Sequence, residues 1–274
     1  MSPAMSDPAA PPAAMPALFI GHGSPMNAIE DNAFSREWAD LARHWPRPRA
    51  ILCISAHWET RGIHVSATAQ PETIHDFHGF PKPLFDVRYP APGSPVLAQR
   101  VAELLGVAPG SHRVHLDQSR GLDHGAWSVL RVIYPKADIP VVQFSLDSAQ
   151  PGAWHYALGR RLAALRDEGV LMVGSGDIIH NLRLFSFHER EVPDWARRFH
   201  GLSKRLIENG DHAALSDYPT LGGDARYAIP TPEHYLPLLY VLAAQRPGER
   251  PAFFNDVVIS ALSMTSFVVG AGAG

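Results

Sequence analysis

The sequence predicts a single-domain α/β protein with a mostly parallel central sheet, flanking helices and C-terminal antiparallel strands. Two observations support this. Short apolar runs alternate with segments of helical spacing, an order typical of a parallel sheet with crossover helices. The run at 50–57 is predominantly apolar and contains β-branched residues, as expected of a strand covered on both faces. We therefore expect one domain at 17–270, after a disordered Ala/Pro-rich tail at 1–16.

The composition narrows the classes of function. The chain has 274 residues, of which 46% are hydrophobic, enough for a large core. The net charge is −3 and no long basic run is present, so we expect no nucleic-acid or membrane partner. The single cysteine, Cys53, cannot form an internal disulfide, which favours a reducing compartment and predicts a cytoplasmic protein. Fifteen histidines favour a metal enzyme, because imidazole is the commonest metal ligand.

The elements of the N-terminal half follow from apolar periodicity and turn residues. The segment at 73–85 is rich in aromatic residues and proline, and is predicted to be a long binding loop. Ser94 and Pro95 are typical of an N-cap and a first helical position. The predicted elements are strands at 17–20, 50–57 and 63–67, and helices at 33–44 and 96–105.

The C-terminal half continues the alternation. Predicted helices lie at 126–133, 153–166, 195–208 and 231–245, and predicted strands at 139–144, 170–173, 253–259 and 262–269. We expect the last of these helices to begin with Thr231 as N-cap and Pro232 at its first position. Glu233 and His234 would then lie in its first turn, about 100° apart, so that only one of them faces a given metal.

Histidines recur at the ends of the predicted buried strands. His22, His57 and His180 each follow an apolar run, and His180 is preceded by a turn predicted at Gly174-Ser175-Gly176. Because ligands of α/β sheets bind beyond the carboxyl ends of the strands, we predict a shared metal site that also includes His234. The alternative is a set of unrelated core or surface histidines, since no closely spaced pair such as His-x-x-x-His identifies the ligands.

Two glycine-rich turns lack the features of other site classes. Neither Gly21–Gly23 nor Gly174–Gly176 completes a dinucleotide fingerprint or a phosphate-binding loop. Ser24 and Ser175 lack the surroundings of a nucleophile elbow. Nucleotide binding and serine hydrolysis are therefore not expected.

Several motifs together resemble one enzyme family. The chain is similar, from about residue 17 to 268, to the 4,5-DOPA extradiol dioxygenase branch of the class III extradiol ring-cleavage dioxygenases. The seven motifs, in the family's order, are Gly21-His22-Gly23-Ser24-Pro25, Ser55-Ala56-His57-Trp58, His75-Asp76-Phe77-x-Gly79-Phe80-Pro81, Tyr89-Pro90-Ala91-Pro92-Gly93, Asp123-His124-Gly125-Ala126-Trp127, Gly174-Ser175-Gly176-Asp177-x-x-His180-Asn181 and Glu233-His234-x-x-Pro237-Leu238.

The resemblance implies one divalent non-haem metal ion per chain. It places His22, His57 and His234 as ligands, His180 as acid/base or a fourth ligand, and His124 as a further catalytic residue in the pocket. Better-known class III enzymes use two histidines and a carboxylate, a set suited to Fe(II) oxygenases. Three histidines suit Zn(II) at least as well. The resemblance favours Fe(II) for ring cleavage, with Zn(II) as an alternative bound ion.

The implied reaction opens the ring of a DOPA-like catechol with O2 and yields a muconate semialdehyde. His75, Phe77, Phe80 and Phe85 are the expected substrate-binding residues, since apolar side chains can line a pocket and limit access of water. Two other classes stay open: a zinc hydrolase of a small amide or ester, and a non-catalytic relative of the family. The oligomeric state is not predicted.

Overall fold

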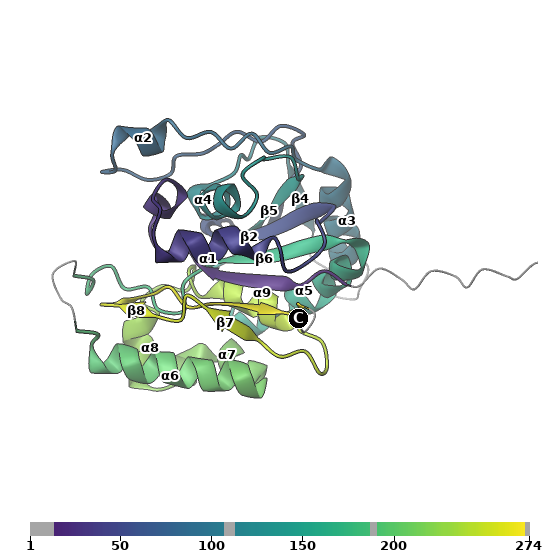
Figure 1. Cartoon of the computed structure of the whole chain (residues 1–274). Coiled ribbons are helices and arrows are strands. Elements are labelled where there is room, and N and C mark those ends of the chain that lie inside the picture. Colours follow the sequence, from purple (N-terminus) through teal and green to yellow (C-terminus); the bar gives the residue numbers. More distant parts are fainter. Residues whose placement is uncertain (1–13, 107–112, 187–190, 272–274) are drawn as a thin grey trace, which may run out of the picture.

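The protein is built on an eight-stranded sheet (Figure 1). The computed structural model describes residues 14–106, 113–186 and 191–271. The strand order is β4-β3-β5-β2-β6-β1-β10-β7, and β8 and β9 form a separate two-stranded sheet. The strands are β1 (Ala17–Gly21), β2 (Ala50–Glu59), β3 (Ile63–Ser66), β4 (Val114–Asp117), β5 (Val141–Leu146), β6 (Val170–Gly176), β7 (Ala252–Phe254), β8 (Val258–Ile259), β9 (Leu262–Ser263) and β10 (Ser266–Val269).

The middle of the sheet is parallel, as the sequence predicts. Strand β2 pairs in parallel with β5 and with β6, and β6 pairs in parallel with β1. Strands β10 and β7 extend the sheet in antiparallel orientation from β1. The carboxyl ends of β1, β2 and β6 therefore meet at one edge, which is where the predicted ligand-bearing segments begin.

The sheet is covered on both faces because successive residues of a strand point to opposite sides. In β2, Ile51 and Cys53 belong to one apolar cluster, whereas Leu52 and Ile54 belong to the other. The helices are α1 (Ala33–Leu41), α2 (Lys82–Phe85), α3 (Pro95–Gly106), α4 (His124–Ile133), α5 (Gly152–Leu162), α6 (Asp194–Asn209), α7 (His212–Ser216), α8 (Gly223–Ala228) and α9 (Leu236–Ala243). Short 3-10 turns η1 (Pro25–Ala28), η2 (Ala163–Glu168) and η3 (Tyr218–Thr220) complete the list.

Two predictions near the site were wrong. Gly174-Ser175-Gly176 is not a turn but the end of buried strand β6, because its pairing with β1 continues to Gly21. The last predicted helix begins at Leu236 rather than Thr231, and Tyr235, not Thr231, is its N-cap. Pro237 explains the late start, since proline is suited to the first turn of a helix. Glu233 and His234 consequently lie in a turn, where the helical angle between neighbours does not apply.

Smaller differences concern strand ends and short elements. Strand β2 continues to Glu59, two residues beyond the predicted end, and His57 lies between Ile54 and Glu59, where the register of pairing with β5 shifts. The predicted 73–85 loop ends in the short helix α2, and β4 and α8 were not predicted. The C-terminal pair of strands is divided into β7, β8, β9 and β10. Residues 1–13 of the predicted tail lie outside the described residues, and Met15 is buried.

No helix within the described ranges is long and apolar enough for a membrane crossing.

Candidate metal centre

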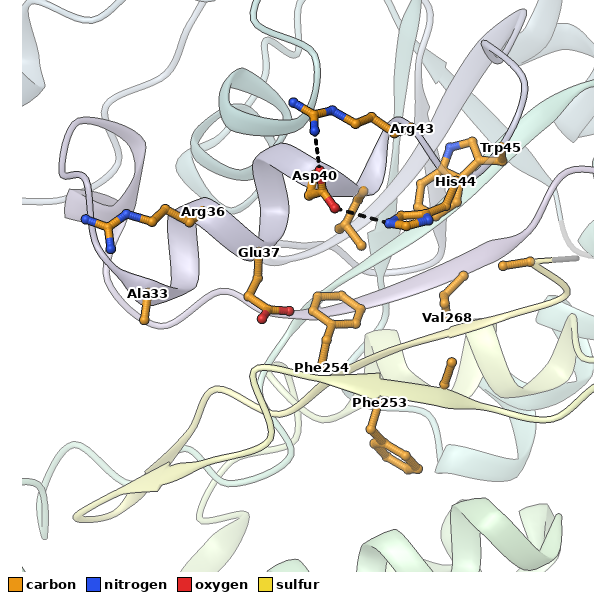
Figure 2. A pocket seen from close by; sticks show the side chains of 13 residues that line it. Ala33, Arg36, Glu37, Asp40, Arg43, His44, Trp45, Phe253, Phe254 and Val268 are labelled. Atoms are coloured by element: carbon orange, nitrogen blue, oxygen red, sulfur yellow. Dashed lines mark ion pairs between the residues drawn. The ribbon is translucent and has the colours of Figure 1, made fainter. Parts of the chain in front are cut away.

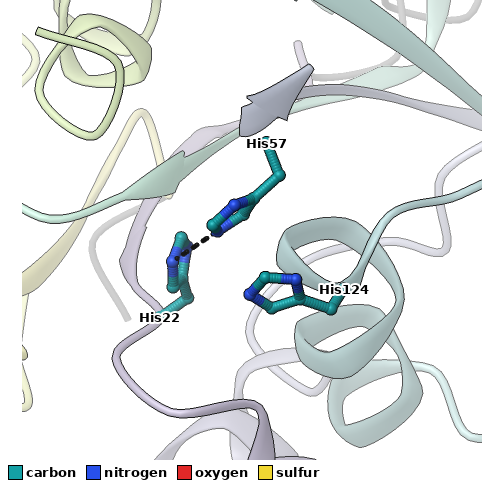
Figure 3. Close-up of side chains that lie close together, drawn as sticks. All are labelled: His22, His57 and His124. Atoms are coloured by element: carbon teal, nitrogen blue, oxygen red, sulfur yellow. Dashed lines mark hydrogen bonds between the residues drawn. The ribbon is translucent and has the colours of Figure 1, made fainter. Parts of the chain in front are cut away.

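The sheet edge brings five histidine side chains together. His22 follows β1, His57 lies near the end of β2 and His180 follows β6. His124 is the first residue of α4, and His234 lies in the turn before α9. The rings of His22, His57 and His124 face the same space from three different elements (Figure 3). The predicted histidines thus form one cluster, although they are widely separated in the sequence.

The three predicted ligands form a nearly regular triangle. The ring centroids are 5.0 Å apart for His22 and His57, 4.9 Å for His57 and His234, and 5.3 Å for His22 and His234. Three imidazoles bound to one ion at about 2.1 Å, at near-tetrahedral angles, would have centroids about 5 Å apart. The spacing therefore fits a single ion.

His124 fits that geometry less well. Its ring centroid lies 3.9 Å from that of His57 and 6.0 Å from that of His22. Ligand atoms of His22, His57 and His124 nevertheless lie within 4.8 Å of one another, as do those of His22, Asp177 and His234 and those of His180, Glu233 and His234. His22 and His234 each belong to two of these groups, which marks them as central.

Hydrogen bonds fix the tautomers of these histidines. The Ser175 hydroxyl donates to the Gly125 carbonyl at 2.6 Å, so its oxygen accepts from Nδ1 of His22 at 2.9 Å. Nδ1 of His234 likewise donates to the Glu233 carboxylate at 2.9 Å. Each bond leaves Nε2 without a proton and free to bind a metal, the arrangement typical of metal-binding histidines.

The remaining contacts are consistent with a bound cation. Nε2 of His22 and Nε2 of His57 are only 3.2 Å apart, so two nitrogen lone pairs converge on one space when both rings bind metal through Nε2. A metal ion between such lone pairs would remove their repulsion. The donor set of the cluster therefore fits a transition metal that prefers imidazole.

Asp177 is a buried carboxylate that the sequence analysis did not select. Its Oδ2 lies 3.6 Å from Nε2 of His22 and has no hydrogen-bond partner among the residues that the structure describes, while its Oδ1 accepts from the Gly23 amide at 3.2 Å. Burial raises the pKa of Asp177 well above its usual value. Asp177 directly follows the apolar strand β6, which is the same sequence signal that marks His22 after β1.

Burial favours the neutral form of His22, His57, His180 and His234. Burial, and then the neighbouring His57 ring, lower the pKa of His22 well below its usual value. Burial lowers the pKa of His57 and of His180 to about 4 in each case. Burial also lowers the pKa of His234 strongly. Neutral imidazole is the form that binds metals and accepts protons.

The position of His57 depends on the start of α4. A Cβ on Gly125 would lie 2.4 Å from Oγ of Ser55 and 2.8 Å from Cδ2 of His57, so only glycine allows this approach. Ser55 in turn donates to the buried Asp123 carboxylate at 2.7 Å. Arg120 donates both to the His57 carbonyl at 3.2 Å and to Asp123 at 2.9 Å. Strand β2 and helix α4 are thereby locked together beside the cluster.

His180 and His124 have different surroundings. The His180 ring stacks on the His234 ring with centroids 3.4 Å apart and an angle of 8° between the planes. His124 donates through Nδ1 to the Asp76 carboxylate at 3.0 Å, which leaves its Nε2 unprotonated. Asp76 was not selected from the sequence as a partner of His124.

The aromatic loop reaches the cluster through Phe77. Its ring centroid is 5.5 Å from that of His124, and Phe80 and Phe85 pack on the other side of it at 5.3 Å and 5.0 Å. The His75 side chain instead donates to the Val87 carbonyl at 3.1 Å and so holds the loop to its own continuation. Among the predicted substrate-binding residues, Phe77 is therefore the one in ring contact with the histidine cluster.

A large hollow of about 820 Å³ lies elsewhere, between α1 and the β7–β10 edge (Figure 2). Its lining includes the ion pairs of Asp40 with Arg43 and His44, beside Phe254. None of its lining residues belongs to the histidine cluster. The convergent polar groups that chemistry needs are in the cluster, so the hollow is not the reaction site.

Comparison with known proteins gives one family. Residues 16–262 match the family described as the catalytic LigB subunit of aromatic ring-opening dioxygenase. A "4,5-DOPA dioxygenase extradiol" of Escherichia coli (strain K12) is 49% identical over 98% of this chain and 100% of its own length. A protein of the same name from Beta vulgaris is 42% identical over 87% of this chain and 90% of its own.

A solved structure agrees with these sequence matches. The crystal structure of an uncharacterized protein from Escherichia coli K12 superposes with a TM-score of 0.80 at 44% identity, covering 93% of this chain and 99% of the other. The resemblance inferred from the motifs is confirmed, and neither the hydrolase nor the non-catalytic alternative is favoured. The chain belongs to the LigB family of aromatic ring-opening dioxygenases and is a metal-dependent extradiol ring-cleaving enzyme.

Proposed function

We propose that this enzyme opens the ring of a DOPA-like catechol with O2 to give a muconate semialdehyde, with Fe(II) as the working metal. The observation that carries the proposal is the triangle of His22, His57 and His234 at the end of the sheet, in which Nε2 of His22 and of His234 is unprotonated. The names of the relatives, which specify 4,5-DOPA and extradiol cleavage, support the choice of substrate.

In this proposal His22, His57 and His234 hold the metal. When bound, the metal would supply Lewis acidity and the open coordination positions that an extradiol reaction with O2 requires. Its positive charge would also favour the ionised form of Asp177, which lies buried beside His22 and would then offset part of that charge. Zn(II) would fit the same donors, so the choice of iron rests on the reaction class rather than on the ligands.

We assign proton transfer to His180. The His180 ring stacks directly on the His234 ring. These two rings therefore cannot be spaced around one ion as the rings of His22, His57 and His234 are. A neutral imidazole at that place can accept a proton from a catechol hydroxyl and return it later in the reaction. His124, whose Nε2 is a hydrogen-bond acceptor, would receive a bond from a substrate hydroxyl and so orient the ring.

Phe77 would pack on the aromatic ring of the substrate, with Phe80 and Phe85 behind it. The aromatic wall would exclude water from the reacting centre. His75 acts on the substrate only by holding this loop in place, because its ring is committed to the Val87 carbonyl. We assign the whole activity to one domain at 17–270 in the cytoplasm, where the lone buried thiol of Cys53 needs no partner.

The experiment is oxygen uptake by Fe(II)-reconstituted protein with DOPA and a panel of other catechols. The expected result is one O2 consumed per ring opened, and no uptake by the Zn(II) form. The His57→Ala variant should lose both iron and uptake, whereas the His44→Ala variant, which removes an exposed histidine outside the cluster, should keep both. Ring opening without O2, or full activity in His57→Ala, would contradict the proposal.

A further inference from the structure

We propose that His64, His115 and Asp117 form a second binding site, specific for a borderline divalent transition-metal ion such as Zn(II). The residues lie on the neighbouring parallel strands β3 and β4. His64 is directly opposite His115 in the register, and Asp117 is two residues further along β4, so all three side chains share one face. One ligand atom from each lies within 4.8 Å of the others.

The three side chains are available for a ligand. The two imidazole rings have centroids 4.6 Å apart, and neither ring makes a hydrogen bond to any residue that the structure describes. Oδ1 of Asp117 accepts from the amide and hydroxyl of Ser119 and from the amide of Arg120, at 2.8, 2.8 and 2.9 Å. These bonds orient the carboxylate and leave Oδ2 for a cation. His115 is exposed and the other two are half-buried, so an ion can enter from solvent.

The donor set selects the class of ion. Imidazole nitrogen suits Zn(II), Cu(II), Ni(II) and Co(II), whereas Ca(II) and Mg(II) prefer sets of oxygen ligands. Two imidazoles and one carboxylate are the number of protein ligands found in open zinc sites, where water fills the remaining position. The site is separate from the cluster at the sheet edge, because it shares no residue with it.

Such an ion would join two strands at the border of the sheet. Strand β4 has four residues and, among the described strands, pairs only with β3 at the edge of the sheet. Few backbone hydrogen bonds therefore hold it, and an ion bridging His64 and His115 would strengthen its attachment. It would also fix Asp117, which holds the turn that leads to Arg120. Arg120 in turn donates to the His57 carbonyl, so the second site adjoins the support of the catalytic strand.

Calorimetric titration with Zn(II) tests the proposal on protein whose cluster has first been loaded with metal. We expect the unchanged chain to bind one further ion, and His64→Gln and His115→Gln each to weaken that step by about tenfold or more, since each removes one of three ligands. The matched control is His44→Gln, which removes an exposed imidazole outside either group and should bind the further ion normally.

A thermal melt without added metal checks the fold of the variants. The His115→Gln chain should melt at the temperature of the unchanged chain, because the exposed His115 ring has no hydrogen bond to lose among the described residues. The half-buried His64 ring also contacts Trp58, so His64→Gln should melt cooperatively at the same or a slightly lower temperature. Added Zn(II) should then raise the melting temperature of the unchanged chain and of His44→Gln more than that of His115→Gln. Absence of the further ion in the unchanged chain, or its equal binding by His115→Gln, would overturn the proposal.

Discussion

The tautomers of His22 and His234 are decided by neighbours outside the cluster. The Ser175 hydroxyl gives its own proton to the Gly125 carbonyl, so toward Nδ1 of His22 its oxygen can only accept. Glu233, one residue before His234, plays the same part for that ring. These two partners therefore determine which nitrogen faces the metal, and their loss should be measurable as a loss of metal affinity.

Two substitutions of Glu233 test its hydrogen bond to His234. Replacement by Ala removes the acceptor of Nδ1 of His234, and we expect metal affinity to fall by roughly 10- to 100-fold. Replacement by Gln retains a carbonyl oxygen that can accept the same bond, and the loss should be smaller. Competition with a chelator measures both affinities. Equal affinities in Glu233→Ala and the unchanged chain would show that this bond does not orient the ligand.

Replacement of His180 should slow the reaction without loss of the metal. The His180→Gln variant is expected to keep its metal and to lose roughly 10²- to 10⁴-fold in kcat, the range for removal of a positioned proton-transfer group. Metal analysis and steady-state kinetics on the same preparation give the two numbers. A variant that loses its metal would instead identify His180 as a ligand, and one with near-normal turnover would exclude both roles.

Helices and strands could be predicted where an apolar pattern repeats, but not where tertiary packing determines the end of an element. The apolar runs that became β1, β2 and β6 were recognised, together with the histidines beyond them, because strand ends are marked by an abrupt change in polarity. The start of α9 was misplaced, since Thr231-Pro232 has the local chemistry of a helix start. Only the packing of the chain around Pro237 decides against it.

The same limit explains the residues that were missed. Asp177 faces His22 because β1 and β6 are neighbours in the sheet, a pairing that no local pattern reveals. The opposition of His64 and His115 likewise depends on the register of β3 and β4. Strand β4 was not predicted at all, because it is short, sits at an edge and is only partly buried. The candidate histidines could thus be found from the sequence, but the residues that strand pairing brings beside them could not.

The close contact between helix α4 and strand β2 leaves no room for a side chain at Gly125. The Gly125→Ala variant would place a methyl group against Ser55 and the His57 ring, so we expect the ring to shift and metal affinity to fall. Overpacking of this kind costs roughly 1–3 kcal/mol of stability. Chemical unfolding and metal titration measure the two effects.

The matched control is Gly201→Ala, within α6, where the new Cβ meets only the end of the Arg205 side chain at 3.4 Å. Alanine is the better helix former, so stability should rise slightly there and metal affinity should stay unchanged. If Gly125→Ala behaved like Gly201→Ala, the close approach of His57 to α4 would not matter for the site.

At the scale of the whole molecule, buried histidines link stability to pH. His155 in α5 donates from Nε2 to the Asp147 carbonyl at 3.1 Å and accepts at Nδ1 from the Tyr240 hydroxyl of α9 at 2.9 Å. The bond from Tyr240 requires the neutral ring, because a protonated Nδ1 cannot accept. Burial lowers the pKa of His155 to about 4. The unfolded chain, with a histidine pKa near 6.5, therefore binds a proton that the folded chain does not.

Protonation of His155 destabilises the fold only in acid. Above pH 6.5 His155 is neutral in both states and contributes no pH dependence. As the pH falls from 6.5 towards 4, the free energy of unfolding should fall by about 1.4 kcal/mol per pH unit for this one group. Urea unfolding of metal-free protein at several pH values gives the slope of the unfolding free energy against pH. Between pH 6.5 and 4 this slope should be smaller in His155→Gln than in the unchanged chain, by the equivalent of about one proton. The His44→Gln control should keep the full slope, and an unchanged slope in His155→Gln would contradict the assignment.

The proposed metal centre holds one ion between His22, His57 and His234. Anomalous X-ray diffraction from crystals loaded with Fe(II) under anaerobic conditions would locate that ion. We expect a strong peak at the end of the sheet, about 2.0–2.2 Å from Nε2 of each of the three rings. A peak coordinated by His57 and His124 without His234, or the absence of metal from the cluster, would rule out this ligand set.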